Sequence, residues 1–199
     1  IGSVGPHDDL TRPARPWLVA PTLTGAGLRL REWRTSDLEA VEEREHPEHW
    51  TPSSTLRPAN ADEWLTRTWE GAAEGTSVTW CVADEASDRA LGYVAVFRRD
   101  GATLGAGDDA ELGYTVFPSA RGRGVAAAAT RLVVDHVTSP RERGGLGLRR
   151  LTAMTSADNA GSNAVQRGLG FGVCGHEHAT DALPDGSWAD CLRWERLSR

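Results

Sequence analysis

Apolar and polar residues alternate along several short segments of the chain, and this period of two is typical of β-strands. Seven segments are predicted as strands: residues 28–31, 78–82, 91–97, 110–117, 151–155, 171–178 and 188–197. Apolar residues at helical spacing predict four helices, over residues 36–45, 60–72 and 125–137 and in a short segment after Asn159. Ser36 and Glu39 fit a capping box at the start of the first helix.

The order of these elements predicts an α/β fold of the α+β type. A strand–helix–strand unit over residues 110–155 requires a parallel pair of strands joined by a right-handed crossover. We therefore expect a mixed, mostly antiparallel seven-stranded sheet whose fourth and fifth strands are parallel and splayed, with about four helices. Residues 1–22 contain four prolines and no periodicity, which predicts a flexible N-terminal arm before a single domain over residues 23–199.

Composition narrows the class of protein. The net charge is −6, and all 22 basic residues are arginine, with no basic stripe of the kind that binds nucleic acid. No apolar stretch reaches the length of a membrane span. The three cysteines, Cys81, Cys174 and Cys191, have no metal-binding spacing. We expect a cytoplasmic protein without a nucleic-acid or membrane partner.

The most informative segment is a glycine loop between a strand and a helix. Residues 121–126 read Arg-Gly-Arg-Gly-Val-Ala and open a helix directly after Pro118. Free N–H groups in the first turn and the helix dipole make such a junction an anion site. Gly122 and Gly124 allow close approach of a ligand, and Arg121 and Arg123 add positive charge.

This loop has two alternative interpretations. The spacing of Gly122, Gly124 and Ala127 also fits a dinucleotide fingerprint, which would indicate a nicotinamide or flavin enzyme. The chain lacks the repeated strand–helix units and the acidic residue that belong to that fingerprint. The second alternative is a helix that simply begins after a glycine turn.

The segment Val116-x-Pro118-x-x-Arg121-Gly122-Arg123-Gly124-Val125-Ala126 resembles the acyl-CoA loop of the GCN5-related N-acetyltransferases (GNAT). The nearer resemblance is to the ribosomal-protein N-terminal acetyltransferases of the RimJ/RimL type, and it covers about residues 22–199. The supporting motifs are residues 28–31, 111–114, 159–162, 170–171, 190 and 194–197.

The resemblance implies acetyl-CoA as co-substrate, no metal, and an amine-bearing acceptor. It assigns the CoA pyrophosphate to the backbone amides of Arg121, Gly122, Arg123, Gly124, Val125 and Ala126. It assigns the pantetheine arm to the main chain of Tyr114, Thr115 and Val116 and to the side chain of Asn159, with Ser162 at the sulfur. A role as helix cap is the alternative for Asn159.

Acetyl transfer to an amine needs a group that removes a proton from the amine. We expect Glu111 to be this base, acting through water, and the alternative is a glutamate in a surface ion pair. Many relatives carry a tyrosine that acts as general acid seven residues after the position of Asn159, but this chain has Gln166 there. Ser162 is then the remaining candidate to protonate or solvate the thiolate.

Four residues are candidates for binding the acceptor: Trp33, His49, Trp50 and Trp188. Pro47 interrupts the spacing of His46 and His49 that a metal site on a helix would need. His176 and His178 share one face of a strand, where cross-strand packing is expected in place of a metal.

These observations predict an N-acetyltransferase in which the amine attacks the thioester directly within a ternary complex. The acceptor is either a protein or peptide N-terminus or a small amine such as an antibiotic or an amino-acid-like metabolite. The alternative from another functional class is a protein that binds CoA but catalyses no reaction. A monomer and a homodimer are both compatible with the sequence.

Overall fold

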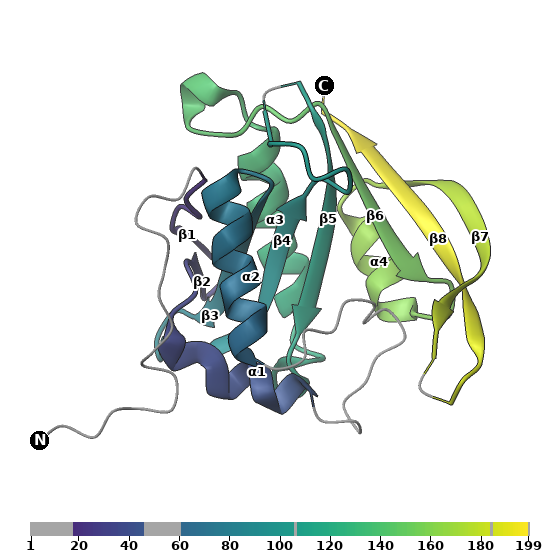
Figure 1. The fold of residues 1–199 in the computed structure, drawn as a ribbon, viewed down its shortest axis with the longest axis horizontal. Helices are drawn as coiled ribbons and strands as arrows, with labels where there is room; N and C mark the ends of the chain where they lie inside the picture. The colour runs from purple at the N-terminus through teal and green to yellow at the C-terminus, as the bar shows by residue number, and fades with distance from the viewer. Residues whose placement is uncertain (1–17, 46–60, 106, 184, 199) are drawn as a thin grey trace, which may run out of the picture.

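A computed structural model describes residues 18–45, 61–105, 107–183 and 185–198. Within them, eight strands form one sheet in the order β1-β2-β3-β4-β5-β6-β8-β7 (Figure 1). The strands are β1 (Leu23–Gly25), β2 (Leu28–Arg31), β3 (Ser77–Asp84), β4 (Ala90–Phe97), β5 (Asp109–Val116), β6 (Arg150–Ser156), β7 (Gly172–Ala182) and β8 (Trp188–Leu197).

The predicted mixed sheet is confirmed. Strands β5 and β6 pair in parallel, and the other neighbouring strands pair antiparallel. The predicted number of seven strands is one too low, because β1 pairs with β2 across a turn at Ala26 and Gly27. With three residues, β1 is too short to show an alternating pattern.

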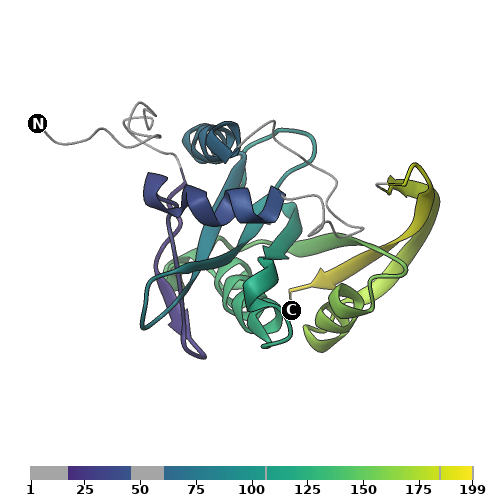
Figure 2. The same ribbon diagram turned by 90° about the horizontal axis from the view of Figure 1, so that it is seen from below.

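The four predicted α-helices are present among the described residues. They are α1 (Leu38–Glu45), α2 (Ala61–Glu74), α3 (Val125–Thr138) and α4 (Ala160–Gly168), with short 3-10 turns at η1 (Thr35–Asp37), η3 (Pro118–Ala120) and η4 (Arg141–Arg143). Helices α1 and α2 cover one face of the sheet, and α3 and α4 cover the other (Figure 2). None of these helices has the length and apolar character needed to cross a bilayer.

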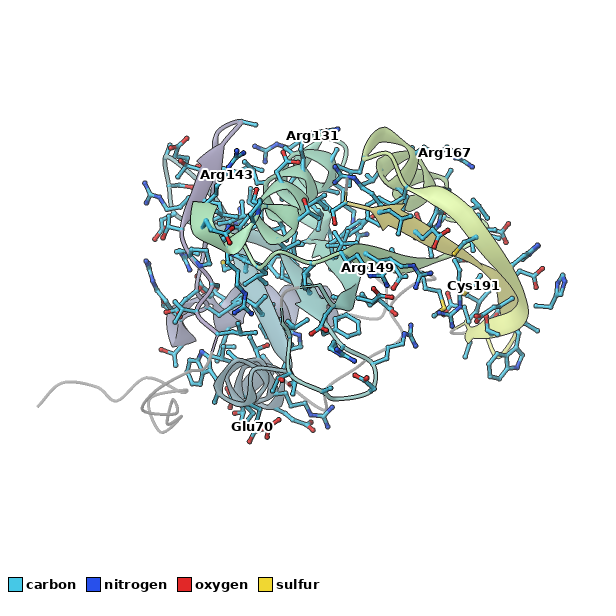
Figure 3. All side chains as sticks on the ribbon, turned by 90° about the horizontal axis from the view of Figure 1, so that it is seen from above. Glu70, Arg131, Arg143, Arg149, Arg167 and Cys191 are labelled. Carbon is cyan, nitrogen blue, oxygen red and sulfur yellow. The ribbon has the colours of Figure 1, made fainter. Side chains whose placement is uncertain are left out.

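Each face of the sheet carries its own apolar cluster. On the side of α3, the sheet contributes Trp80, Leu151 and Trp194 to the larger cluster, where all three are almost fully buried. On the side of α1 and α2, Leu65 and Phe117 lie at the centre of a smaller cluster. Arg131 and Arg167 project from α3 and α4, and Glu70 projects from α2 on the other side of the sheet (Figure 3).

The last residues of the predicted N-terminal arm, residues 18–22, contact the rest of the domain. Within the arm predicted over residues 1–22, Leu18 donates its backbone N–H to Ala72 O at 2.9 Å. Ala20 is buried, and Trp80 Nε1 donates to Pro21 O at 2.9 Å. Residues 18–22 are therefore part of the packed domain, and residues 1–17 lie outside the described residues.

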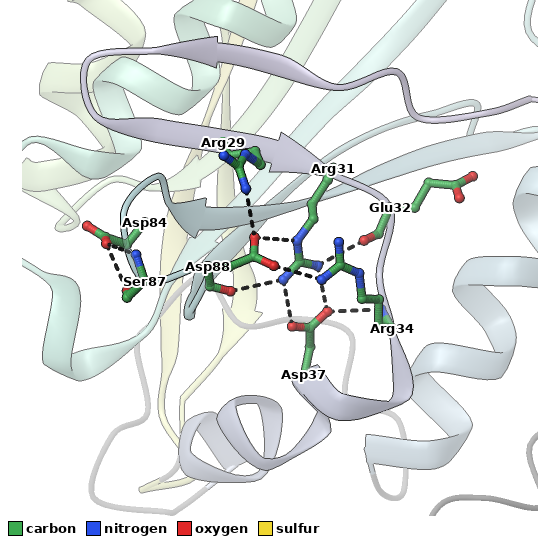
Figure 4. A network of polar contacts seen from close by, with 8 residues as sticks. All are labelled: Arg29, Arg31, Glu32, Arg34, Asp37, Asp84, Ser87 and Asp88. Atoms are coloured by element: carbon green, nitrogen blue, oxygen red, sulfur yellow. Dashed lines mark hydrogen bonds and ion pairs between the residues drawn. The ribbon is translucent and has the colours of Figure 1, made fainter.

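A buried ion-pair network fastens β2 to the start of the first helical segment (Figure 4). Arg31, 4% exposed, donates to both carboxylate oxygens of Asp37, 6% exposed, at 2.8 and 2.9 Å. Its Nε also donates to Asp88 at 2.9 Å, in the turn between β3 and β4. One guanidinium therefore ties the end of β2 and the following 3-10 turn to the distant turn between β3 and β4.

The same network replaces the predicted capping box. Asp37 accepts a hydrogen bond from the Arg34 backbone N–H at 2.9 Å, and the segment begins as a 3-10 turn at Thr35. Ser36 therefore lies inside the turn, and its predicted role as the cap residue is wrong. The carboxylate that completes the cap comes from Asp37, and the same side chain also binds the buried Arg31.

Candidate active site

Strands β5 and β6 form a gap in the middle of the sheet. They pair only through Asp109, Ala110 and Glu111, opposite residues 150–152, and they diverge beyond these positions (Figure 1). Strand β6 stays paired with β8 as far as Ser156, and β5 stays paired with β4 as far as Val116. The facing edges of β5 and β6 therefore carry backbone groups that an extended ligand can reach.

Hydrogen bonds at the end of β5 define which backbone groups face this gap. Phe117 N–H donates to Leu91 O of β4 at 2.8 Å, whereas Val116 O accepts from Arg121 Nε at 3.0 Å. Because backbone groups alternate in direction along a strand, those of Tyr114 and Val116 face β6 and those of Thr115 face β4. Of the three residues predicted to pair with pantetheine, Tyr114 and Val116 have the required direction.

The glycine loop forms a turn that only glycine adopts easily. Gly122 and Gly124 have φ values of +72° and +75°, and a Cβ at either position would meet nothing within 4 Å. Backbone conformation, and not lack of space, therefore requires glycine here. The first hydrogen bond of α3 runs from Ala128 N to Gly124 O, so the N–H groups of residues 125–127 point out of the helix end. This end of α3 is suited to an anion.

The predicted loop arginines are both exposed, but they differ in contacts. Arg121 is bound through its Nε to Val116 O, which fastens the loop to the end of β5. The Arg123 guanidinium lowers the pKa of Asp84 as a minor contribution beside the hydrogen bonds from Ser87. Both side chains add positive charge next to the N-terminus of α3.

The N-terminus of α4 lies on the other side of the gap. The Asn159 side-chain oxygen accepts from Ser162 N–H at 3.0 Å, so Asn159 caps this helix as the alternative interpretation stated. Its contact with a pantetheine arm stays a prediction. The Ser162 carbonyl accepts from the Tyr114 hydroxyl at 3.3 Å, which links α4 to β5 at the gap.

The phenol of Tyr114 is a feature of the site that the sequence did not indicate. Gln166, which stands where a tyrosine was expected, is fully buried and donates from Nε2 to the Tyr114 hydroxyl at 3.5 Å. Burial raises the pKa of Tyr114, so the hydroxyl keeps its proton. A phenolic hydroxyl thus reaches α4 from β5.

A buried polar network holds α4 against the end of β6. Thr155 Oγ1 donates to Asn163 Oδ1 at 2.5 Å and accepts from Trp194 Nε1 at 2.8 Å. Asn163 Nδ2 donates to Ala157 O at 2.9 Å. The network ties the end of β6 to α4 and to β8, and no sequence motif pointed to it.

The predicted base, Glu111, is 9% exposed and is the last residue of β5 that pairs with β6. Arg99 binds both of its carboxylate oxygens, with Nη2 at 2.6 Å from Oε1 and Nε in contact with Oε2. The ion pair that was the alternative interpretation is therefore present. Side chains alternate along a strand, so Glu111 and Tyr114 project from opposite faces of β5 and flank the gap.

The predicted acceptor residues have different environments. Trp33 is buried in the cluster under α1 and α2 and contacts the Trp64 ring edge-on at 4.6 Å. It is packed as a core residue, and its contact with an acceptor stays a prediction. Trp188 is 62% exposed at the start of β8. His49 and Trp50 lie outside the described residues.

One buried carboxylate has no partner. Asp181 on β7 is 1% exposed, and neither of its oxygens has a hydrogen-bond partner within the described part of the chain. Burial raises the pKa of Asp181. The folded protein therefore binds this proton more tightly than the unfolded chain, and stability falls as the pH rises from the ordinary aspartate range through the raised pKa.

We expect Asp181→Asn to raise the Tm at pH 7.5 by about 2–4 °C, the shift that a gain of about 1 kcal/mol produces in a protein of this size. The gain should shrink as the pH is lowered, because protonation then removes the same charge from the parent protein. Differential scanning calorimetry measures both effects. The control is Asp185→Asn on the same hairpin, whose exposed carboxylate is bound by Ser187. A lower Tm for Asp181→Asn would show that this carboxylate stabilises the fold.

A splayed parallel pair of strands followed by a glycine turn at a helix N-terminus is an arrangement suited to an extended, phosphate-bearing ligand. The sequence profile of the acetyltransferase (GNAT) domain family matches residues 27–172. The chain belongs to this family and is an N-acetyltransferase by class, as the resemblance implied. A search of curated proteins gives no match.

Solved structures share the fold at low sequence identity. The ribosomal-protein-S5-alanine acetyltransferase of Vibrio fischeri is 18% identical, with a TM-score of 0.72 over 89% of this chain and 97% of that chain. RimL, a ribosomal L7/L12 α-N-protein acetyltransferase in complex with coenzyme A, is 18% identical, with a TM-score of 0.71 over 89% and 98%. A chimera of spermidine N-acetyltransferase SpeG from Vibrio cholerae and hSSAT is 18% identical, with a TM-score of 0.68 over 87% and 96%.

Proposed function

We propose that the protein transfers an acetyl group from acetyl-CoA to a primary amine, by direct attack of the amine in a ternary complex. The observation that carries this proposal is the gap between β5 and β6, which leads directly to the glycine turn of α3. An extended pantetheine arm fits the unpaired strand edges, and a pyrophosphate fits the N–H groups at the helix end.

Named residues would hold the co-substrate. The backbone groups of Tyr114 and Val116 face the gap and would pair with the pantetheine amides. The N–H groups of residues 122–126 would bind the pyrophosphate, and Arg123 would add charge. Asn159 and Ser162 begin α4 on the opposite side and would contact the arm near its sulfur.

The proposed acetyl transfer uses Glu111 and Tyr114, which lie on opposite faces of β5. Glu111 would take a proton from the acceptor ammonium through water, and the neutral amine would then attack the thioester carbonyl and form the new N–C bond. The C–S bond would break as the tetrahedral intermediate collapses, and the second proton of the nitrogen would pass to the departing thiolate. Arg99 orients the Glu111 carboxylate by binding both of its oxygens. Backbone N–H groups in the gap would stabilise the oxyanion. The hydroxyls of Ser162 and Tyr114 would solvate the thiolate, which is a good leaving group without a strong acid.

The acceptor is proposed only as an amine-bearing molecule. The net charge of −6 favours a cationic acceptor, and the similar structures act on different acceptors by name, a ribosomal protein in RimL and spermidine in SpeG. The turnover experiment described below therefore uses both protein N-termini and small amines as acceptors. Action in the cytoplasm as a monomer or homodimer belongs to the same proposal.

The first experiment tests CoA binding. We expect Gly122→Val to weaken CoA binding at least tenfold in isothermal titration calorimetry, because the side chain enters the proposed pyrophosphate cradle and the φ of +72° disfavours valine. The matched control is Gly144→Val, at a φ of +79° with equally open surroundings in the loop after α3. Equal CoA affinity in the two variants would contradict the cradle.

The second experiment tests turnover. Thiol release from acetyl-CoA is measured with a panel of peptide N-termini, polyamines and amino-acid amides. Saturable, amine-dependent release supports the proposal. CoA binding without turnover on any amine would instead support the non-catalytic module, for which Gln166 at the tyrosine position is the one favouring observation. A thermal shift with NAD but none with acetyl-CoA would favour a nicotinamide enzyme.

A further inference from the structure

Two histidines and an aspartate meet on the hairpin formed by β7 and β8, outside the site described above. His176 Nε2 and His178 Nδ1 each lie 3.0 Å from the same oxygen, Oδ2 of Asp190. The three potential ligand atoms lie within 4.8 Å of one another. The imidazoles are accessible, with side chains 49% and 80% exposed. The sequence predicted cross-strand packing here, and both rings do contact the neighbouring strand, where they converge on one carboxylate.

A bulge in β7 brings these three side chains together. Glu177 and Asp181 of β7 pair with Cys191 and Ala189 of β8, so β7 has two more residues than β8 in this interval. Ala179, within the bulge, has a φ of +51°, which is costly for a residue with a Cβ.

The bulge also fixes the shared carboxylate. The backbone N–H of Ala179 donates to Asp190 Oδ1 at 2.9 Å. With Oδ1 held in this way, Oδ2 is presented to both histidine rings. The three side chains therefore come from two strands and are oriented by the backbone.

We propose that His176, His178 and Asp190 form a binding site for a divalent transition-metal ion, with Zn²⁺ the best match. Two neutral imidazole nitrogens and one carboxylate oxygen are ligands that Zn²⁺ prefers, and water takes the fourth position. Zinc bonds of about 2.0–2.2 Å in a tetrahedral arrangement place ligand atoms about 3.3–3.6 Å apart. Small rotations of exposed rings bring the three atoms to this spacing.

The ion would act as a clamp between β7 and β8 at the edge of the candidate active site. The backbone carbonyl of Asp190 accepts from Ala157 N–H at 2.7 Å, two residues before Asn159. An ion on Asp190 would therefore stiffen the segment that leads into α4. The metal site does not depend on the proposed acetyl transfer, since its ligands lie outside the gap.

Zinc binding by untagged, chelator-treated protein tests the proposal, measured by isothermal titration calorimetry. We expect one equivalent of Zn²⁺ to bind with a micromolar or lower Kd, and His176→Gln and His178→Gln each to weaken this binding at least tenfold. The matched control is His136→Gln on α3, which removes a histidine that packs on Trp80 and should leave binding of this equivalent unchanged. An absence of saturable binding in the parent protein would overturn the proposal, as would equal affinity in either cluster variant.

Two further measurements separate a site of three ligands from loose surface binding. Co²⁺ in place of Zn²⁺ should give the visible absorption bands of a four-coordinate ion, and Asp190→Asn should abolish them. Zn²⁺ should also raise the Tm of the parent protein but not that of the double variant lacking both cluster histidines. Weak octahedral Co²⁺ spectra, or an equal Tm shift in the double variant, would contradict the clamp.

Discussion

Replacing Glu111 with glutamine is expected to lower kcat by about 100-fold or more, the typical contribution of a general base. The KM for acetyl-CoA should change by less than about threefold, because the co-substrate contacts lie on backbone groups and on the N-terminus of α3. Glutamine keeps the shape of the side chain and one oxygen for Arg99. The loss should therefore report proton transfer, measured by thiol release under saturating acetyl-CoA and amine.

The matched control for this prediction is Glu195→Gln. Glu195 lies opposite Thr152, which itself lies opposite Glu111, so the two glutamates share one row across the sheet. Glu195 is also paired with an arginine, Arg150. This variant should keep kcat within about twofold. Unchanged kcat in Glu111→Gln would remove the base assignment and leave the Glu111–Arg99 pair with a structural role only.

The second large effect is expected for stability. Replacing Arg31 with methionine should lower the free energy of unfolding by about 3–5 kcal/mol, the usual loss when one partner of a buried ion pair is removed. Asp37 would be left buried without this partner, beside Cys81, whose pKa is already raised by burial. Urea denaturation measures the loss, and the Tm should fall by about 2–4 °C for each kcal/mol.

Two variants test the cause of that loss. Arg34→Met removes an exposed partner of Asp88 and should cost less than about 1 kcal/mol, as expected for a surface ion pair. The double variant Arg31→Met/Asp37→Leu should recover most of the lost stability, because it removes the orphaned carboxylate together with its partner. A loss below about 1 kcal/mol in Arg31→Met would contradict the role of the network.

Local patterns predicted most of the fold, and non-local contacts explain the errors. The parallel pair followed from the strand–helix–strand unit, whose elements each have a clear period. Strand β1 was missed because its three residues form a strand only by pairing with β2. The start of the first helix was misplaced because Asp37 caps it while binding Arg31, a contact that no local pattern contains.

In the candidate site too, local motifs predicted some features, and non-local contacts explain the others. The glycine turn and the cap by Asn159 are local, and their sequence motifs located them. The pairing of Glu111 with Arg99 depends on the antiparallel pairing of β4 with β5, because Arg99 follows the end of β4. The contact of Tyr114 with α4 depends on how β6 diverges from β5. The convergence of His176 and His178 on Asp190 depends on a bulge at Ala179, a residue that carries no turn signal.

The position of β8 in the sheet also constrains the order in which the protein can assemble during synthesis. Strand β7 is made first but reaches the sheet only through β8, which lies between it and β6. Until β8 has left the ribosome, β7 lacks its neighbour and β6 presents an unpaired edge, which is the kind of surface that recruits foreign strands. The nascent chain is therefore exposed to aggregation in the interval between these two strands.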